Sequence, residues 1–513
     1  MSQQRVPKSA HPEGEPNSEL QTITQAVMTA GLAVDTVGRR FHVEWDPQAP
    51  VTPLGQVVFF SQFLATSGLY AQWVAGCPLR YTSPNAPSIG DVLGTSVLAI
   101  LSGAYRYAHV TALRGDQVNP QGLGMEKVVS EDSLRRAFQN GEAQALRAWQ
   151  ADWLLETCAP ALEQPWIADL DVTVKPIYGH QEGAELGYNP HKPGRPSHSY
   201  HTIFLRKLRL VLDVEVRSGK EHASVHGLSN LWRGLGRLKP AQRPWLVCGD
   251  AGYGNERLMN QCEIRKQSYL FRQRETKGVN QLIQMLECQG GWQSVREEWS
   301  GCEGQLQLTG WTCKRRAVVF RRLHKSTAAI GGQELLEQGG VQVQSGPLYE
   351  YVVLVTNLGE NLLSLLHLYR QRADAENAYD ELKNQWGWGG FTTRDLLRCQ
   401  VTARIVAQVY NWWSLFVRCA DPTRAREAIS SRPLLLCSIG RIIRSGGQTT
   451  LRLTSNHAQA AEAQSLLTKL SVFLSGLSNT AEQLSASERW RRIWDRILSP
   501  YRQPSRALLT ESG

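Results

Sequence analysis

The chain has 513 residues, 42% of them hydrophobic and 20% charged, with a formal net charge of +10. This length exceeds what one hydrophobic core supports and predicts three or four domains, while the positive charge favours a nucleic-acid partner. The ten cysteines include no C-x-x-C pair and no apolar run approaches about 18 residues, which argues against a disulfide framework, a zinc knuckle and a membrane span.

The first third of the chain predicts a tail followed by helices. Residues 1–19 are polar and contain three prolines, which is typical of a disordered segment. Residues 20–160 have a helical pattern, and the mostly apolar stretches 58–74 and 92–107 are expected to be buried. Ser130, followed by two acids, is a good helix N-cap. We therefore expect a helical N-terminal domain with some basic faces.

Residues 161–274 predict the first part of an α/β core. The segment from Ile167 to Lys175 alternates strictly, with Asp169 and Asp171 on its polar face. Two aligned carboxylates repel each other unless a cation lies between them, so this strand predicts a metal site. Further strands are expected at 202–208, 208–217, 245–250 and 268–272, with helices before the last two.

A rigid, basic loop lies between the first two predicted strands. Residues 187–197 contain three prolines and present Lys192 and Arg195. Cations beside the carboxylates would suit a DNA backbone, and the alternative is an ordinary solvated loop.

Residues 275–347 predict a β-rich insertion into the core. Short strands around glycine turns are expected at 292–295, 305–311, 316–323 and 341–344. Several lysines and arginines accompany the aromatic residues of this segment. Its tryptophans Trp292, Trp299 and Trp311 are candidates for stacking on a base, and each is also suited to packing.

The segment from Leu362 to Lys383 lacks proline and glycine, so we expect one uninterrupted helix. On such a helix, a carboxylate, two cations and a phenol fall within an arc of about 60°, namely Tyr369, Arg372, Glu376 and Lys383. This set suits a phosphodiester, because a carboxylate can hold a metal while cations and a hydroxyl hold phosphate oxygens. The alternative is a solvated helix face with ion pairs.

The spacing Tyr-(2)-Arg-(3)-Glu-(6)-Lys resembles the signature of bacterial insertion-sequence transposases of the cut-and-paste group, which have an Asp-Asp-Glu site. Asp171-Val-Thr and Gly-Asp250-Ala-Gly-Tyr resemble the other two signature blocks of that family, in the same order. The resemblance implies a ribonuclease-H-like catalytic core made of residues 161–274 and 348–420. The insertion would interrupt this core, and the mostly helical regions 20–160 and 421–513 would flank it.

The resemblance also implies roles for individual residues. Asp171, Asp250 and Glu376 would be the catalytic metal ligands, with Asp169 kept as a supporting alternative beside Asp171. The phosphate-binding residues near the cut would be Tyr369, Arg372 and Lys383. One of the three insertion tryptophans would stack on a flipped base, and the N-terminal helices would bind the inverted repeats.

The implied reaction uses two Mg²⁺ ions, which Mn²⁺ can replace. Water would cut the element's end, often closed afterwards as a hairpin, and the freed 3′-OH would join to target DNA. No nucleotide cofactor is implied, and the sequence has no G-x-x-x-x-G-K-[ST] motif. The partners would be double-stranded DNA at the inverted repeats and the target, with a homodimer expected because transposition joins two ends. The implied location is the bacterial cytoplasm, at the nucleoid and without a membrane partner.

Two other functions stay open from the sequence. A metal nuclease on the same fold would cut without joining strands, and an inactive or domesticated DNA-binding regulator would do neither. In the C-terminal region, Trp490, Ile493, Trp494 and Ile497 form an apolar helical stripe. That stripe predicts a dimer contact, a phosphate-binding helix with basic residues opposite, or docking within the chain.

Overall fold

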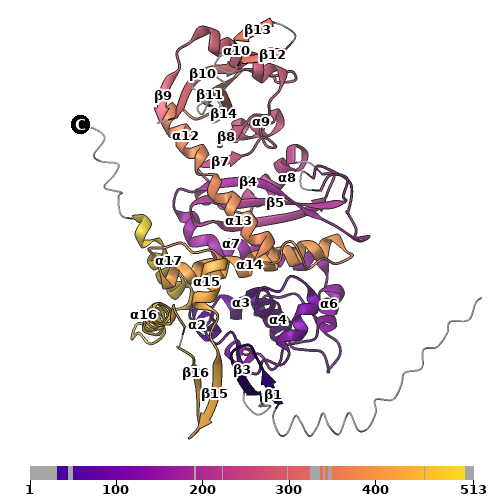
Figure 1. Ribbon diagram of the computed structural model, residues 1–513, viewed down its shortest axis with the longest axis vertical. Helices are drawn as coiled ribbons and strands as arrows, with labels where there is room; N and C mark the ends of the chain where they lie inside the picture. Colours follow the sequence, from indigo (N-terminus) through magenta and orange to yellow (C-terminus); the bar gives the residue numbers. More distant parts are fainter. Residues whose placement is uncertain are drawn as a thin grey trace, which may run out of the picture.

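The computed structural model describes residues 32–43, 50–189, 192–221, 223–296, 298–323, 335–338, 341–344, 349–455 and 457–502. A nine-stranded sheet forms its centre, and helices from both ends of the chain form a layer beneath the sheet (Figure 1). Among the described helices, none combines the length and the apolar character that a membrane crossing needs.

Five strands form one half of the sheet, in the order β6-β5-β4-β7-β8. β5 is antiparallel to β4 and β6, whereas β7 is parallel to β4 and β8. The strands expected at 167–175 and 268–272 are confirmed. The bounds are β4 (Ile167–Pro176), β5 (Ser197–Leu205), β6 (Leu210–Ser218), β7 (Leu246–Gly249) and β8 (Ser268–Arg272), with the short turns η3 (Arg206–Leu208) and η4 (Pro240–Gln242) between strands.

The two parallel connections each contain a helix. α8 (Ala223–Leu235) leads into β7, and α9 (Glu256–Ile264) leads into β8. Leu258, Met259 and Cys262 of α9 pack in the same apolar cluster as Tyr269 and Phe271 of β8. The opposite face of β7 and β8 carries Cys248 and Leu270, which pack in a second cluster with the helix α12 (Leu362–Arg370). Helices therefore cover both faces of the parallel strands.

The strands of the insertion continue the central sheet. β14 is antiparallel to β8, and β11, β10 and β9 follow in that order. The strand expected at 305–311 is wrong, because β10 ends at Leu306 and the chain turns at Gly310 with a φ of 88°. The elements are α10 (Lys277–Gln289), β9 (Gln293–Arg296), β10 (Trp299–Leu306), β11 (Arg315–Leu323), the pair β12 (Leu335–Gln338) and β13 (Val341–Gln344), and β14 (Tyr349–Thr356).

The helix α14 (Leu396–Ala420) lies between the sheet and the layer of terminal helices. Most of its side chains are buried. It also has a polar stripe that faces β6, the edge strand of the sheet. Asn411 accepts a hydrogen bond from the Val211 amide at 2.9 Å and donates to the Val211 carbonyl at 2.8 Å. These two bonds take the place of a neighbouring strand.

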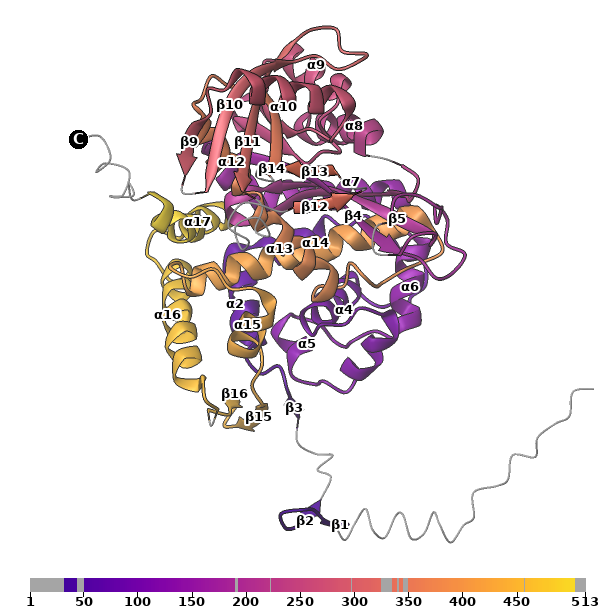
Figure 2. The same cartoon turned by 45° about the horizontal axis from the view of Figure 1, so that its top comes forward.

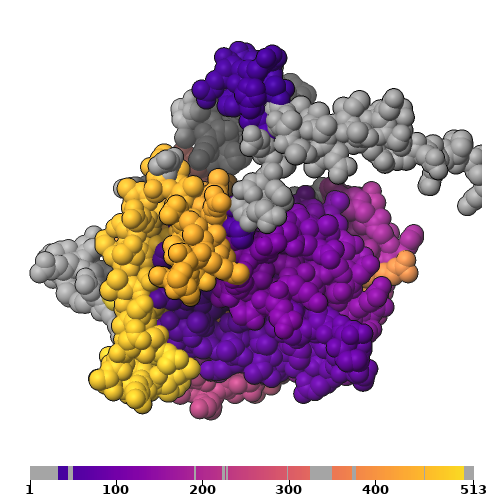
Figure 3. All heavy atoms as spheres, turned by 90° about the horizontal axis from the view of Figure 1, so that it is seen from below, coloured from indigo at the N-terminus to yellow at the C-terminus, as the bar shows by residue number. Residues whose placement is uncertain are grey.

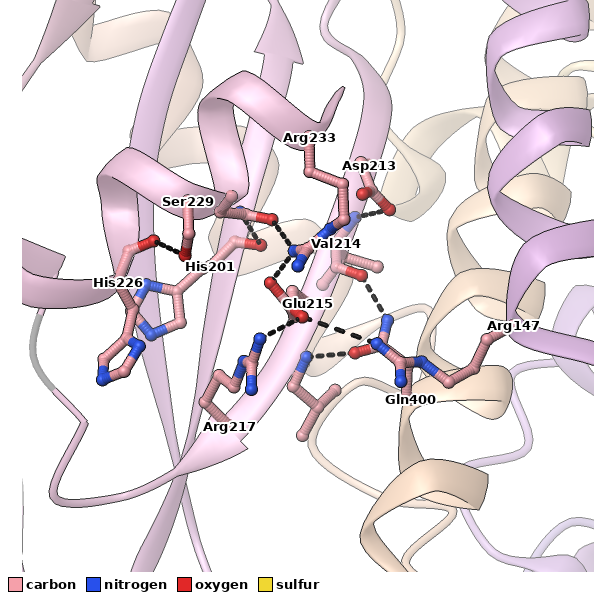
Figure 4. A network of polar contacts seen from close by, with 12 residues as sticks. Arg147, His201, Asp213, Val214, Glu215, Arg217, His226, Ser229, Arg233 and Gln400 are labelled. Carbon is pink, nitrogen blue, oxygen red and sulfur yellow. Dashed lines mark hydrogen bonds and ion pairs between the residues drawn. The ribbon is translucent and has the colours of Figure 1, made fainter. Parts of the chain in front are cut away.

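Gln400 repeats this arrangement three turns earlier on α14. Its Oε1 accepts from the Val216 amide at 2.5 Å, and its Nε2 donates to the Val214 carbonyl (Figure 4). Beside it, the buried carboxylate of Glu215 contacts three arginines from three elements, namely Arg147 of α7 (Ala143–Cys158), Arg217 of β6 and Arg233 of α8. The edge strand is thereby fixed to helices by side chains.

We expect Asn411→Leu to lower the free energy of unfolding by about 3 kcal/mol, because the Val211 amide and carbonyl would lose their partners in a buried place. Urea unfolding monitored by tryptophan fluorescence measures this change. Leu397→Ala, at an exposed position near the start of α14, is the control and should leave stability nearly unchanged. An unaltered midpoint for Asn411→Leu would show that the amide does not support the edge strand.

The N-terminal helices are present as predicted, and Ser130 caps α6 by accepting a hydrogen bond from the Ser133 amide at 3.2 Å. The stretches expected to be buried form α2, α3 and α4. The elements, with α7 above, are β1 (Leu32–Asp35), β2 (Arg40–Val43), β3 (Val51–Thr52), α2 (Val57–Ser67), α3 (Leu69–Ala75), α4 (Ile89–Leu101), η1 (Tyr107–Leu113), α5 (Asn119–Gly122), α6 (Glu131–Asn140) and η2 (Ala159–Glu163). The disordered segment predicted for residues 1–19 lies outside the described part of the chain.

Helices of the N-terminal and C-terminal regions pack together in one layer (Figures 2 and 3). Its C-terminal elements are α15 (Ala428–Leu435), β15 (Gly440–Ser445), β16 (Gln448–Leu453), α16 (Ala460–Ser478) and α17 (Ala486–Arg502). The Phe63 ring of α2 lies 6.0 Å from that of Trp490. All four residues of the predicted apolar stripe on α17 are buried. The stripe therefore docks within the chain, whereas phosphate binding by the basic residues on the opposite side of α17 stays a prediction.

Candidate active site

Two carboxylates belong to adjacent parallel strands, one in the middle of β4 and one directly after the end of β7. β4 pairs with β7 in register from Ile167–Leu246 to Leu170–Gly249. One residue beyond the last pair stand Asp171 on β4 and Asp250 after β7. Residues at matching positions on neighbouring strands project to the same face of a sheet, so the register brings the two predicted acids side by side.

The Asp171 carboxylate is largely enclosed. Its Oδ1 accepts from the Val172 amide at 2.7 Å, and its Oδ2 lies 3.6 Å from Nη2 of Arg372. Burial raises the pKa of Asp171 to about 7, Arg372 opposes this rise, and the charge of Asp250 adds to it. The two carboxylates therefore repel each other across a poorly solvated gap.

Asp250 is held by the turn that follows β7. Its Oδ1 accepts a hydrogen bond from the Gly252 amide at 2.9 Å. Within the described residues, its Oδ2 has no hydrogen-bond partner. Hard carboxylate oxygens, placed together and not saturated by hydrogen bonds, are the ligands that Mg²⁺ and Mn²⁺ prefer. The donor set thus fits the predicted metal, although the described residues contain no group of three ligands at metal-binding distance.

Asp169 has a different role from the one its position on the strand suggests. Its side chain is fully buried, and it forms a two-pronged pair with Arg206, whose Nε lies 2.6 Å from Oδ2. The expectation that a metal must separate Asp169 from Asp171 is therefore wrong. An arginine 37 residues later neutralises the first acid, and only the second remains beside Asp250.

The helix that carries the four signature residues is broken, contrary to the expected single helix. α12 ends at Arg370, and α13 (Ala373–Asn384) begins after a tight turn. Nη1 of Arg206 donates to the Leu368 carbonyl at 2.5 Å, and the Arg372 amide bonds to the Tyr369 carbonyl at 3.0 Å. The carbonyl that would continue the helix is occupied by a side chain, which explains the break.

Arg372 stands at this break and is buried, with 7% of its surface exposed. Its Nε lies 3.6 Å from Oδ1 of Asp169, and Nη2 donates to the Leu170 carbonyl at 3.4 Å. Together with the contact to Asp171, these interactions make it a positioning residue for both acids of β4. A direct contact between Arg372 and phosphate stays a prediction.

α13 crosses the sheet above Asp171. The buried Tyr379 hydroxyl is hydrogen-bonded to Oγ1 of Thr202, the β5 residue that pairs with Asp171, and Thr202 donates to the Asp171 carbonyl at 3.1 Å. Glu376 belongs to the first turns of the same helix, one turn before Tyr379, and its side chain lies outside the described residues. Its role as third ligand therefore stays a prediction.

The remaining signature residues are Tyr369, just before the helix break, and Lys383, near the C-terminal end of α13. Tyr369 is half-buried near the end of α12, and Lys383 is half-buried in the last turn of α13. The Asp380 carboxylate, between them on α13, accepts a hydrogen bond from the Asn384 side chain at 2.6 Å. Phosphate contacts by Tyr369 and Lys383 stay predictions.

The predicted basic loop presents a small cationic cluster. Lys192 donates a hydrogen bond to the Tyr178 hydroxyl, and the Arg195 guanidinium lies 4.8 Å from the centre of the same ring. All three side chains are exposed. The two predicted cations thus share one aromatic residue, Tyr178, which the sequence did not single out.

The three candidate tryptophans of the insertion are each close to an arginine. Trp299 is almost fully buried beside Arg322, whereas Trp292 and Trp311 are half-buried beside Arg321 and Arg315. All three contribute to packing. Which of them contacts a base stays a prediction, and the burial of Trp299 favours the other two.

One cation at the site was missed from the sequence. β7 and β8 pair in register up to Gly249–Phe271, so Arg272 stands beside Asp250 at the next position. Arg272 is exposed, and it has no ion pair among the residues that the structure describes. With Arg274, it lines a hollow of about 280 Å³ that also touches Ala251, the neighbour of Asp250. Only the strand register, which no local pattern encodes, reveals this placement.

The family model described as "Transposase DDE domain group 1" matches residues 56–473. A solved structure of the piggyBac transposase synaptic complex with hairpin DNA resembles the chain with a TM-score of 0.38 and 10% identity, covering 88% of this chain and 87% of that one. None of the curated proteins matches the sequence significantly.

Proposed function

Since this chain belongs to the family of DDE transposase domains of group 1, we propose that it is a cut-and-paste DNA transposase of an insertion sequence. It would cleave DNA at the inverted repeats of the element and join the freed 3′-OH to target DNA. The observation that carries this proposal is the register of β4 and β7, which places Asp171 and Asp250 side by side.

The strand arrangement supports a ribonuclease-H-like core. Three antiparallel strands, β6-β5-β4, continue into the parallel strands β7 and β8, with an acid in the middle of β4, an acid directly after β7 and a later helix bearing an acid. In this proposal Glu376 completes the site from α13. The insertion would then lengthen the core sheet beyond β8.

Some residues of the site would bind the metal ions, and others would position those ligands or bind the DNA. Asp171, Asp250 and Glu376 would hold two divalent cations, which supply Lewis-acid activation of water and of the phosphate when bound. Arg372 favours the ionised form of Asp171, and Arg206 fixes Asp169 and the helix break. Tyr369 and Lys383 would hold phosphate oxygens beside the cut, and Lys192 and Arg195 would follow the backbone further away.

A strand-transfer assay tests the proposal against the nuclease alternative. Purified full-length protein would be incubated with Mg²⁺, a duplex ending in the repeats that flank the gene, and a supercoiled target plasmid. We expect cut ends and joined products. Cutting without joined product would assign a nuclease, and specific binding without cutting would assign the regulatory function.

Arg272 is expected to hold a phosphate beside Asp250, because the strand register places it next to that residue and it is exposed without an ion pair in the described structure. Arg272→Ala should slow cleavage about tenfold, which is the effect of losing one charge-assisted hydrogen bond. Arg257→Ala, an exposed arginine of α9 on the other face of the sheet, is the control. Equal rates for wild type and Arg272→Ala would remove this residue from the site.

A further inference from the structure

The hairpin of β15 and β16 projects from the layer of terminal helices, away from the central sheet (Figure 1). Its strands pair from Gly440–Leu453 to Ser445–Gln448. The connection is Gly446-Gly447, with φ angles of 57° and 75°. Left-handed conformations at both central positions form the tight turn whose twist matches two antiparallel strands. The hairpin is therefore a regular ribbon rather than an irregular loop.

The base of this ribbon is anchored to β3, and one of its two faces is exposed. Ile442 is buried, and the backbone of Gly440 pairs with Thr52 of β3. Close approach to Gly55 leaves little room for a side chain at residue 440, because a Cβ there would lie 3.0 Å from the Gly55 Cα. The base of the ribbon is thus fixed, while the face that carries Arg441 is exposed.

The exposed face carries two cations at directly opposed positions. Arg441 pairs across the strands with Arg452, so both side chains project to the same side. Both are exposed, and neither has an ion pair within the described part of the chain. The segment from Ser438 to Ser455 contains three arginines and no acid. Like charges facing each other destabilise an isolated hairpin, so an anionic partner would relieve a cost that the free protein bears.

From these observations, we propose that the β15–β16 hairpin is a DNA-binding ribbon whose Arg441 and Arg452 contact backbone phosphates of the duplex. A two-stranded ribbon fits the major groove, and arginines on one face can reach phosphates at its rim. This inference rests on the proposed function for the choice of duplex DNA as partner. The inference adds a DNA contact on the opposite side of the molecule from the insertion strands (Figure 1).

The test measures binding of full-length protein to a duplex carrying the flanking repeats, at several salt concentrations. For the double variant Arg441→Gln/Arg452→Gln, the slope of log K against log salt should decrease by about 1.8, and affinity at physiological salt should fall about tenfold. At saturating DNA, the cleavage rate should equal that of wild type, because the carboxylates are untouched. Gln448→Ala/Thr450→Ala, on the same face, is the uncharged control and should match wild type.

The outcomes separate this inference from the proposed function. An unchanged slope and affinity in the double variant, while wild type binds and cuts, would overturn the ribbon and leave the transposase intact. An unchanged slope with altered self-association would also overturn it, because the surface would then contact protein. If wild type neither binds nor cuts the repeats, the proposed function fails and the inference fails with it.

Discussion

Asp250→Asn is expected to lower DNA cleavage by about 10³-fold, because a metal ligand contributes several kcal/mol of transition-state stabilisation. The same substitution should raise the free energy of unfolding by about 1 kcal/mol in EDTA, since it removes a negative charge beside Asp171. Cleavage of a labelled repeat duplex and thermal unfolding measure the two effects. A site built for a cation is expected to show these opposite changes.

The stability gain should depend on pH. In the wild type, the pKa of Asp171 rises from 3.8 to about 7 in the folded state, so the folded protein holds the proton more tightly and stability falls as pH rises between these values. Removing the Asp250 charge lowers that pKa, so the gain is absent below pH 3.8 and complete above pH 7. Asp380→Asn, at an exposed position of α13, is the control and should not show this pH-dependent gain. A loss of stability in Asp250→Asn would contradict a repulsive pair.

Arg372→Ala is expected to lower the free energy of unfolding by about 3 kcal/mol and to abolish cleavage as well. The substitution leaves Asp171 buried without its cation and removes the bridge between Asp169 and the helix break. From the sequence alone, cleavage is expected to fall far more than stability. The burial of Arg372 changes this expectation, because the side chain supports the fold and the site together.

Arg370→Ala is the control for Arg372→Ala, because it removes a neighbouring arginine that does not contact the acids of β4. Arg370 is the exposed last residue of α12 and lies two positions before Arg372. Urea unfolding should distinguish the two variants clearly, with Arg370→Ala close to wild type. If Arg372→Ala unfolded at the wild-type midpoint while losing cleavage, Arg372 would act on the substrate directly instead of positioning Asp171.

Patterns within one element were predicted well from the sequence. The alternation of residues 167–175 identified β4, the apolar run before Asp250 identified β7, and Ser130 marked the start of α6. Each of these signals depends on residues that are neighbours in the chain. The choice of Asp171 and Asp250 as the two acids came instead from the resemblance of their sequence blocks to the transposase signature, and the parallel register explains why they meet.

Features that depend on distant contacts were not predicted. The single helix expected at 362–383 is broken because Arg206 binds the Leu368 carbonyl. Asp169, kept as an alternative beside Asp171, is paired with the same arginine. The insertion strands join the central sheet through β14, which no local pattern reveals. Arg272 acquires its place beside Asp250 from the register of β7 and β8. In all these cases, the decisive partner lies far away in the sequence.

Metal-dependent cleavage at the repeat boundary is the most direct measurement of whether Asp171, Asp250 and Glu376 form the active site of a transposase. Full-length wild type and Glu376→Gln would be compared on a duplex carrying the gene's flanking inverted repeats, with Mg²⁺ or Mn²⁺ and with EDTA. Wild type is expected to nick specifically at the boundary with either metal, and no nicking is expected with Glu376→Gln or in EDTA. Equal nicking by Glu376→Gln would contradict the three-carboxylate site, and binding without nicking by both proteins would contradict the transposase itself.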